Sequence, residues 1–148
     1  MATRTQVIAE ARSWMGTRFH HQARVKGVGV DCINLVIAVA TELQLIAPDF
    51  VWESYPEYQG YGLSPNEPLL LAGCERFLVR ISLKEVRPAD ILILKFATEA
   101  QHFALVTQTE PTYIIHAYAQ VRRVTEHGFD ALWQSRLVAC YRFKNLED

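Results

Sequence analysis

The sequence predicts an α+β fold, because patterns typical of helices fill its first part and patterns typical of strands fill its second part. Apolar residues recur at helical spacing as far as Leu45, whereas short runs rich in Val, Ile, Leu, Tyr and Phe follow from Phe77 onward. Half of the 148 residues are hydrophobic and 21% are charged, enough to bury a core without disulfides or bound metal. We expect a single domain, residues 1–148, with N-terminal helices packed on a mostly antiparallel sheet of five to six strands.

Three segments are predicted to be helical. Residues 3–15 carry apolar side chains at helical spacing and are followed by a glycine. Asp31 is a good N-cap for a second helix, whose apolar stripe begins at Cys32 and continues to about Leu45. A shorter helix is expected over residues 65–76, with a proline in its first turn.

Two segments lack periodicity. Residues 17–30 contain glycines and two adjacent histidines and are expected to form a long loop. Residues 47–62 combine prolines and glycines with five aromatic side chains. These rings either cover the core or line a binding cleft, since aromatic side chains commonly line ligand pockets.

The second part of the chain predicts a run of strands. Asp90 is expected to shape a turn into one of them, because Asp readily bonds neighbouring backbone groups. The predicted strands cover residues 78–83, 91–96, 103–107, 113–117, 120–125 and 137–143.

Composition excludes several function classes. The 15 Lys and Arg against 16 Asp and Glu give a net charge of −1, so we expect no nucleic-acid partner. No apolar run approaches the roughly 20 residues that span a bilayer, so we expect no membrane insertion. The first residues lack the apolar centre of a signal peptide. If the target lies outside the cytoplasm, we expect another route of delivery.

Cys32 is the best candidate nucleophile of the three cysteines, Cys32, Cys74 and Cys140. Their odd number and the lack of a CxxC pair fit neither a disulfide framework nor a zinc ribbon. A thiol in the first turn of a helix is expected to have a lowered pKa, because unpaired backbone N–H groups favour negative charge there. Cys74 and Cys140 are interpreted as buried core thiols.

Two histidines are candidates to serve such a nucleophile. His102 opens one predicted strand, and His116 lies 14 residues later, near the end of the next. If these strands form an antiparallel hairpin, both rings project from one face close together. One imidazole can then move the proton of the thiol while the second orients it.

Other interpretations of the polar residues are weaker. His20, His21, His102, His116 and Cys32 are possible zinc ligands, but short ligand spacings typical of zinc sites are absent, so we expect no metal. The pair at positions 127–128, His-Gly, is interpreted as a turn.

Together these stretches resemble the NlpC-type cell-wall cysteine peptidases, in particular the subgroup encoded in phage and prophage tail modules. The first stretch is the specific one, because it forms a long WxGTxF…HQ…KGVGVDC pattern. The resemblance covers nearly the whole chain. The matching stretches are residues 11–32, Arg87-Pro88-Ala89-Asp90-Ile91-Leu92, Gln101-His102-Phe103-Ala104 and Ile115-His116-Ala117.

The resemblance implies a papain-like fold and a cofactor-independent activity. Such enzymes cut peptidoglycan stem peptides, usually between D-glutamate, through its γ-carboxyl group, and the diamino acid. By position, Cys32 would be the nucleophile, His102 the general base and acid, and His116 the residue that orients it. The resemblance also implies synthesis in the bacterial cytoplasm, delivery to the cell wall by a phage tail, and phage tail proteins as possible partners. Its substrate-binding positions are Phe19, His20, His21 and Asp31.

Two departures from the pattern leave alternatives open. Phe19 stands where many members carry a tyrosine, so an active-site hydroxyl is missing unless His20 or His21 replaces it. Asn34 replaces a small residue and is expected to face the sheet. One alternative is a non-catalytic tail or assembly module that binds a cell-wall peptide or a partner protein. The other is a papain-like amidase that acts on another substrate.

Overall fold

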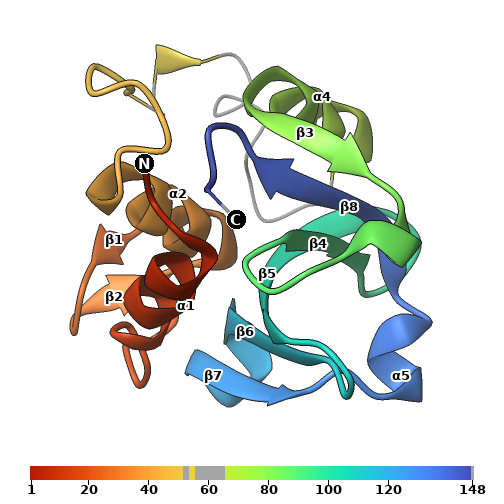
Figure 1. Ribbon diagram of the computed structural model, residues 1–148. Coiled ribbons are helices and arrows are strands. Elements are labelled where there is room, and N and C mark those ends of the chain that lie inside the picture. The colour runs from red at the N-terminus through yellow and green to blue at the C-terminus, as the bar shows by residue number, and fades with distance from the viewer. Residues whose placement is uncertain (52–53, 56–65, 148) are drawn as a thin grey trace.

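The α+β prediction is confirmed by a computed structural model, which describes residues 1–51, 54–55 and 66–147. Figure 1 shows α1 and α2 together on one side of the molecule and the main sheet across the other. The elements are α1 (Arg4–Arg12), β1 (Arg24–Val25), β2 (Gly29–Val30), α2 (Cys32–Glu42), α4 (Glu67–Phe77), β3 (Leu78–Ile81), η2 (Leu83–Glu85), β4 (Ile91–Lys95), β5 (Ala100–Gln108), β6 (Tyr113–Tyr118), η3 (Ala119–Val121), β7 (Arg123–Gly128), α5 (Ala131–Gln134) and β8 (Leu137–Phe143).

The three predicted helices are present, and side-chain caps define where they begin. Thr3 and Gln6 form a reciprocal capping box at the start of α1. Asp31 caps α2 and Asn66 caps α4, each by accepting a hydrogen bond from a backbone N–H three residues later. The predicted helix ends lie about three residues too late for α1 and α2, where turns replace the last helical turn.

The main sheet has the order β3-β8-β4-β5-β6-β7, and every neighbouring pair is antiparallel. Its two faces carry separate apolar clusters. Ile93 and Leu105 belong to the cluster that includes α1 and α2, whereas Leu94 and Val106 belong to the cluster around Trp133 of α5. Because side chains alternate along a strand, each residue of β4 to β7 can be assigned to the helix face or to the α5 face.

Three sequence predictions are wrong in detail. Residues 17–30 are not wholly irregular, because β1 and β2 form a short antiparallel pair within them. The strand predicted over 120–125 begins later, at Arg123, because η3 precedes it, and it continues through Gly128. His127 therefore lies in β7 and not in a turn. The four-residue helix α5, capped by Asp130, was not predicted.

The aromatic segment at 47–62 lies partly outside the described residues, which include Phe50 and Tyr55. The ring of Phe50 stacks on Tyr55 at 5.2 Å between centroids, and both rings meet Phe77 of α4 edge-on. These two aromatic residues therefore pack against α4. The predictions for positions 52, 58 and 61 lie outside the described residues.

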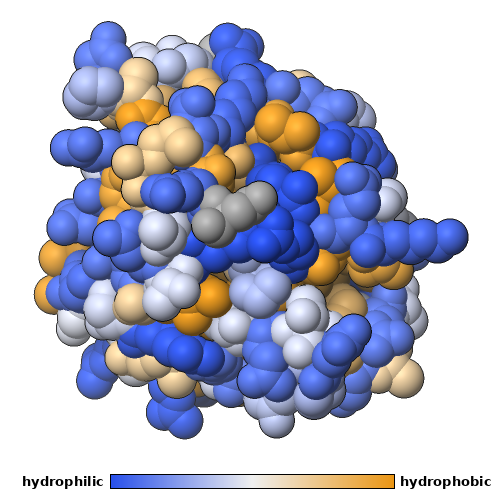
Figure 2. Space-filling view, in the orientation of Figure 1, coloured by the Kyte–Doolittle hydropathy of each residue, from blue (hydrophilic) through white to orange (hydrophobic). Residues whose placement is uncertain are grey.

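Polar side chains cover most of the surface visible in Figure 2. The face shown in Figure 2 is mostly hydrophilic, with apolar side chains in small separate groups. None of the helices in the described part of the chain is both long and apolar enough to cross a bilayer.

Candidate active site

Cys32 is held at the N-terminus of α2 by the carboxylate that precedes it. One oxygen of Asp31 accepts the N–H of Asn34 at 2.9 Å, and the other accepts the N–H of Gln22 at 2.6 Å. Asp31 is 1% exposed and Cys32 is 8% exposed. The cap thus fixes both the first turn of the helix and the segment that leads into it.

The thiol does not have the low pKa that its helical position predicts. Burial, reinforced by the negative charge of Asp31, raises the pKa of Cys32 to about 12. Backbone N–H groups of Phe103, Ile33 and Cys32 itself act in the opposite direction, but they are outweighed. The expected effect of the helix N-terminus is therefore present and smaller than the cost of desolvating a thiolate.

Three histidines form a continuous hydrogen-bonded chain on the sheet. His102 Nε2 lies 2.5 Å from His116 Nδ1, and His116 Nε2 lies 2.8 Å from His127 Nε2. His127 Nδ1 lies 2.9 Å from the carbonyl oxygen of Gly128. The predicted proximity of His102 and His116 is confirmed, and His127 extends the pair.

Strand alternation explains why these rings meet. His102 alternates on β5 with Ala104 and Val106, whose side chains belong to the α5 face. His116 on β6 and His127 on β7 lie on that face too, and each ring is about 5 Å from the ring of Trp133 between centroids. Antiparallel neighbours therefore bring three residues far apart in sequence into one row.

Burial keeps His102 and His116 uncharged. The pKa of His102 falls to about 3, first because of burial and then because of the positive charge of Arg136. The pKa of His116 falls to about 2, mainly because of burial. At neutral pH each of these two rings therefore has one N–H donor and one lone-pair acceptor.

The thiol approaches the histidines from the other face of the sheet. Cys32 belongs to the apolar cluster on the helix face, where α2 packs against β5 and β6. A backbone N–H of Phe103, the residue after His102, points at the thiol. Phe103 has no partner in the β5–β6 register, whose pairs start at Leu105 and Ile115. At this position β5 is paired with β4, through Phe103 and Ile93, and not with β6.

The structure brings Cys32 next to the β5 segment but not into a bond with the imidazole. Within the described residues, no hydrogen bond joins Cys32 to His102. Hydrogen bonds between catalytic groups are often long in ligand-free structures and shorten when substrate binds. Both groups are uncharged here, so the pair is not a preformed thiolate and imidazolium.

The predicted substrate-binding residues Phe19, His20 and His21 lie in the segment that runs beside β2. Phe19 is bridged to Val30, and its N–H donates to the carbonyl of Arg122 at 2.9 Å. His20 is exposed and lies close to Gly29. A Cβ added at Gly29 would lie 2.9 Å from the Cβ of His20. His21 Nδ1 lies 4.0 Å from a carboxylate oxygen of Asp31.

Asn34, which the sequence predicts to face the sheet, makes a polar contact outside the main sheet. Its Oδ1 accepts a hydrogen bond from Arg24 at 2.9 Å, so the side chain turns toward the β1–β2 pair. The side chain is buried, and the larger residue is accommodated by this polar contact.

Sequence reasoning missed His127. No local pattern marks it, because Val124 is followed by three polar residues, Thr125, Glu126 and His127; the pairing of β7 with β6 places it in a strand. Side chains alternate along that strand, so His127 points away from the side of Glu126, which pairs with Arg12 of α1.

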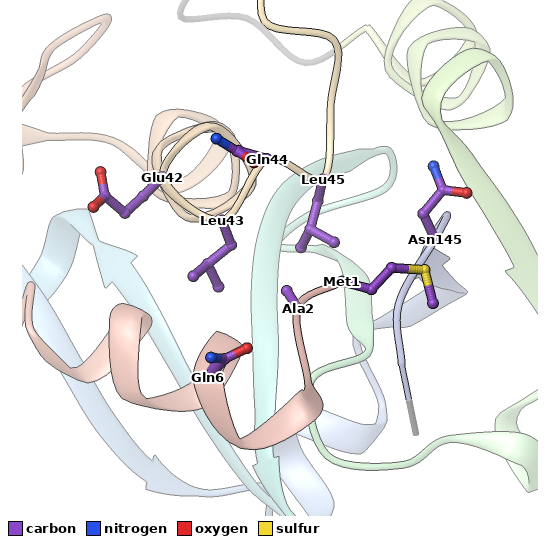
Figure 3. Close-up of a pocket in the computed structure, with 8 residues that line it drawn as sticks. All are labelled: Met1, Ala2, Gln6, Glu42, Leu43, Gln44, Leu45 and Asn145. Carbon is purple, nitrogen blue, oxygen red and sulfur yellow. The ribbon is translucent and has the colours of Figure 1, made fainter.

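A surface pocket lies away from these groups. It has a volume of about 460 Å³ and includes Leu43, Leu45 and Asn145 (Figure 3). It lies at the C-terminal end of α2, whereas Cys32 begins that helix, so the two are separated by about 15 Å of helix. In the described ranges, no group of three or more His, Cys, Asp or Glu side chains is arranged to hold a metal ion.

The raised pKa makes a direct prediction for Cys32. Iodoacetamide is expected to modify it at pH 7 more than about 10-fold more slowly than a free cysteine, because the thiolate fraction is far smaller. The rate should rise as pH increases toward 12. Peptide mapping measures it, with Cys140, whose pKa is raised to about 11, as the internal control. Fast modification of Cys32 alone near pH 6 would show instead that its thiolate is stabilised.

The fold is similar to that of NlpC/P60 domains of known structure. The chain superposes on the NlpC/p60 domain of the peptidoglycan hydrolase SagA with a TM-score of 0.62 and 16% identity, covering 96% of this chain and 100% of that domain. A lipoprotein-like protein of the NLP/P60 family from Staphylococcus aureus gives 0.62 and 18%, over 98% of this chain and 42% of that protein. The peptidoglycan hydrolase RipB from Mycobacterium tuberculosis gives 0.58 and 18%, over 94% and 63%.

These likenesses establish an NlpC/P60-like, papain-like α+β fold. The chain spans less than two thirds of the length of the S. aureus protein and of RipB. No protein-family model matches the sequence, and no curated protein sequence matches it.

Proposed function

We propose that the protein is a cysteine endopeptidase that hydrolyses peptidoglycan stem peptides. The observation that carries this proposal is the hydrogen-bonded pair of His102 and His116 on an NlpC/P60-like fold, with Cys32 at the start of the helix that packs on the same strands. Burying two imidazoles in a core costs free energy, and a buried, hydrogen-bonded imidazole pair suits proton transfer.

In the proposed reaction, the sulfur of Cys32 attacks the carbonyl carbon of the scissile amide and its proton passes to Nδ1 of His102. The imidazolium of His102 then protonates the departing amine, which leaves a thioester on Cys32. Water attacks the thioester, His102 accepts a proton from it, and the thiol is regenerated as the acid product departs. His116 holds the imidazole in place throughout.

The oxyanion requires donors near the sulfur. We assign one of them to the backbone N–H of Cys32 at the helix N-terminus, where it has no helical partner. Asp31 positions this N–H by capping α2, and Phe19, His20 and His21 are proposed to contact the peptide beside it. Because Phe19 has no hydroxyl, one donor is missing there unless a histidine supplies it.

The proposed scissile bond is the amide between the γ-carboxyl group of D-glutamate and the diamino acid. The support for this bond, and for delivery to the cell wall by a phage tail, is the motif resemblance of residues 11–32. The association with phage tail proteins has the same support.

A non-catalytic role is favoured by one specific observation: the thiol and the imidazole are both uncharged and are not hydrogen-bonded to each other in the described part of the chain. In this second candidate function the fold would bind a cell-wall peptide or a partner protein without turnover.

Mass spectrometry of purified muropeptides incubated with the wild-type protein and with Cys32→Ala tests the proposal. We expect fragments split at the γ-D-glutamyl bond with the wild-type protein only. Cys140→Ala is a matched control, because it also replaces a buried thiol and is expected to cleave normally. Binding without fragments from any variant would support the non-catalytic module, and cleavage of non-wall amides alone would support another amidase.

A further inference from the structure

The row of three histidines ends at a contact between His127 and the carbonyl oxygen of Gly128, which can only accept a hydrogen bond. A backbone carbonyl oxygen has no proton to donate, so the contact of 2.9 Å between Gly128 and His127 Nδ1 requires a proton on that nitrogen. In a neutral ring, Nε2 of His127 then carries a lone pair. This one contact sets the direction of the other two hydrogen bonds in the row, His127 to His116 and His116 to His102.

The proton positions can be assigned ring by ring. Because His127 Nε2 accepts, His116 Nε2, 2.8 Å away, must donate to it. Nδ1 of His116 then carries the lone pair and accepts from Nε2 of His102. His102 is left with an unprotonated Nδ1, which is the nitrogen that the proposed reaction needs as a base.

We propose that His127 is a positioning residue that fixes the tautomer of His102, through His116, so that Nδ1 of His102 is free to accept the thiol proton. The catalytic meaning of this inference rests on the proposed function. The assignment of the tautomers rests only on the hydrogen bonds of the row. His127 does not contact the reacting atoms.

The histidine row is buried among aromatic side chains, so its ring nitrogens depend on one another for hydrogen bonds. His116 is fully buried and His102 is 3% exposed, and aromatic rings of Tyr118 and Trp133 lie against the row. In such an environment an unpaired ring nitrogen costs free energy, so the partner of each nitrogen determines its proton. His127 is less buried than the other two, and it ends the row.

A second proton on the ring of His127 would reverse the direction of each hydrogen bond in the row. With protons on both nitrogens, His127 Nε2 would donate to His116, His116 Nδ1 would donate to His102, and His102 would carry its proton on Nδ1. The base would then be blocked. Arg136 is a cation whose charge acts on His102, and its guanidinium lies 4.6 Å from the ring of Trp133, while Glu126 is bound to Arg12.

Two variants separate hydrogen bonding from packing. His127→Leu removes the acceptor for His116, whereas His127→Gln retains an oxygen that can accept. We expect His127→Leu to lower kcat for muropeptide cleavage by about 10- to 100-fold with little change in KM. His127→Gln should recover most of kcat. Glu126→Gln, next to it on β7, is the matched control and should cleave normally.

Nitrogen-15 NMR of the histidine rings tests the tautomers independently of turnover. In the folded wild-type protein we expect Nε2–H on His102 and His116 and Nδ1–H on His127, and a mixture of tautomers at His116 and His102 in His127→Leu. A wild-type Nδ1–H on His102, or unchanged tautomers in folded His127→Leu, would overturn the inference even if muropeptides are cleaved. If the wild-type protein cleaves nothing, the proposed function fails and the NMR spectra still decide the tautomers.

Discussion

Replacing His102 by alanine is expected to reduce the rate of muropeptide cleavage roughly 10⁴-fold. The thiol of Cys32 is neutral at physiological pH, since burial raises its pKa to about 12, and it needs a base at the moment of attack. The departing amine needs an acid. His102 is proposed to supply both, so its loss affects two steps, and initial rates measured by chromatography of the fragments report it.

The control must separate chemistry from folding. His102→Ala also leaves Nδ1 of the buried His116 without its donor, which costs stability. His102→Gln retains an N–H that can reach His116 but provides no base. We expect it to unfold at a temperature close to that of the wild-type protein and to be nearly as inactive as His102→Ala. Cleavage by folded His102→Gln within tenfold of the wild-type rate would exclude His102 as the base.

Local signals predicted the elements that carry Cys32 and His102. Asp31 before an apolar helical stripe is a local capping signal, and α2 begins at the next residue. The runs around His102 and His116 are β-branched and apolar, and β5 and β6 pair as a hairpin. These predictions depend on neighbours in sequence, which is why they were accurate.

The pKa of Cys32 and the role of His127 depend on tertiary structure. Burial of the thiol comes from the packing of α2 on β5 and β6, which no local pattern states, and it reverses the direction predicted from the helix N-terminus. His127 gains its partner from the register of β6 and β7, where Ile114 lies opposite it. The pair His-Gly is a common turn signal, and tertiary pairing overrode it.

Replacing Asp90 by alanine is expected to lower the free energy of unfolding by about 3–5 kcal/mol. The carboxylate is completely buried and meets Arg4 of α1 at 3.0 Å and Arg142 of β8 at 2.9 Å. It also accepts the N–H of Arg87 at 2.8 Å, which confirms its predicted role in the turn before β4. Without it, the side chain of Arg4, which is 9% exposed, would lose this buried carboxylate as a partner for its charge.

Urea unfolding of Asp90→Ala beside Glu126→Ala tests whether burial is the cause. Glu126 also binds an arginine through two oxygens, but Arg12 is half exposed, so its loss should cost no more than about 1 kcal/mol. Asp90→Asn keeps an acceptor for the turn and should fall between the two. Equal losses in the Asp90→Ala and Glu126→Ala variants would contradict the prediction. A larger loss for Asp90→Ala means that this carboxylate ties α1 and β8 to the turn that begins β4.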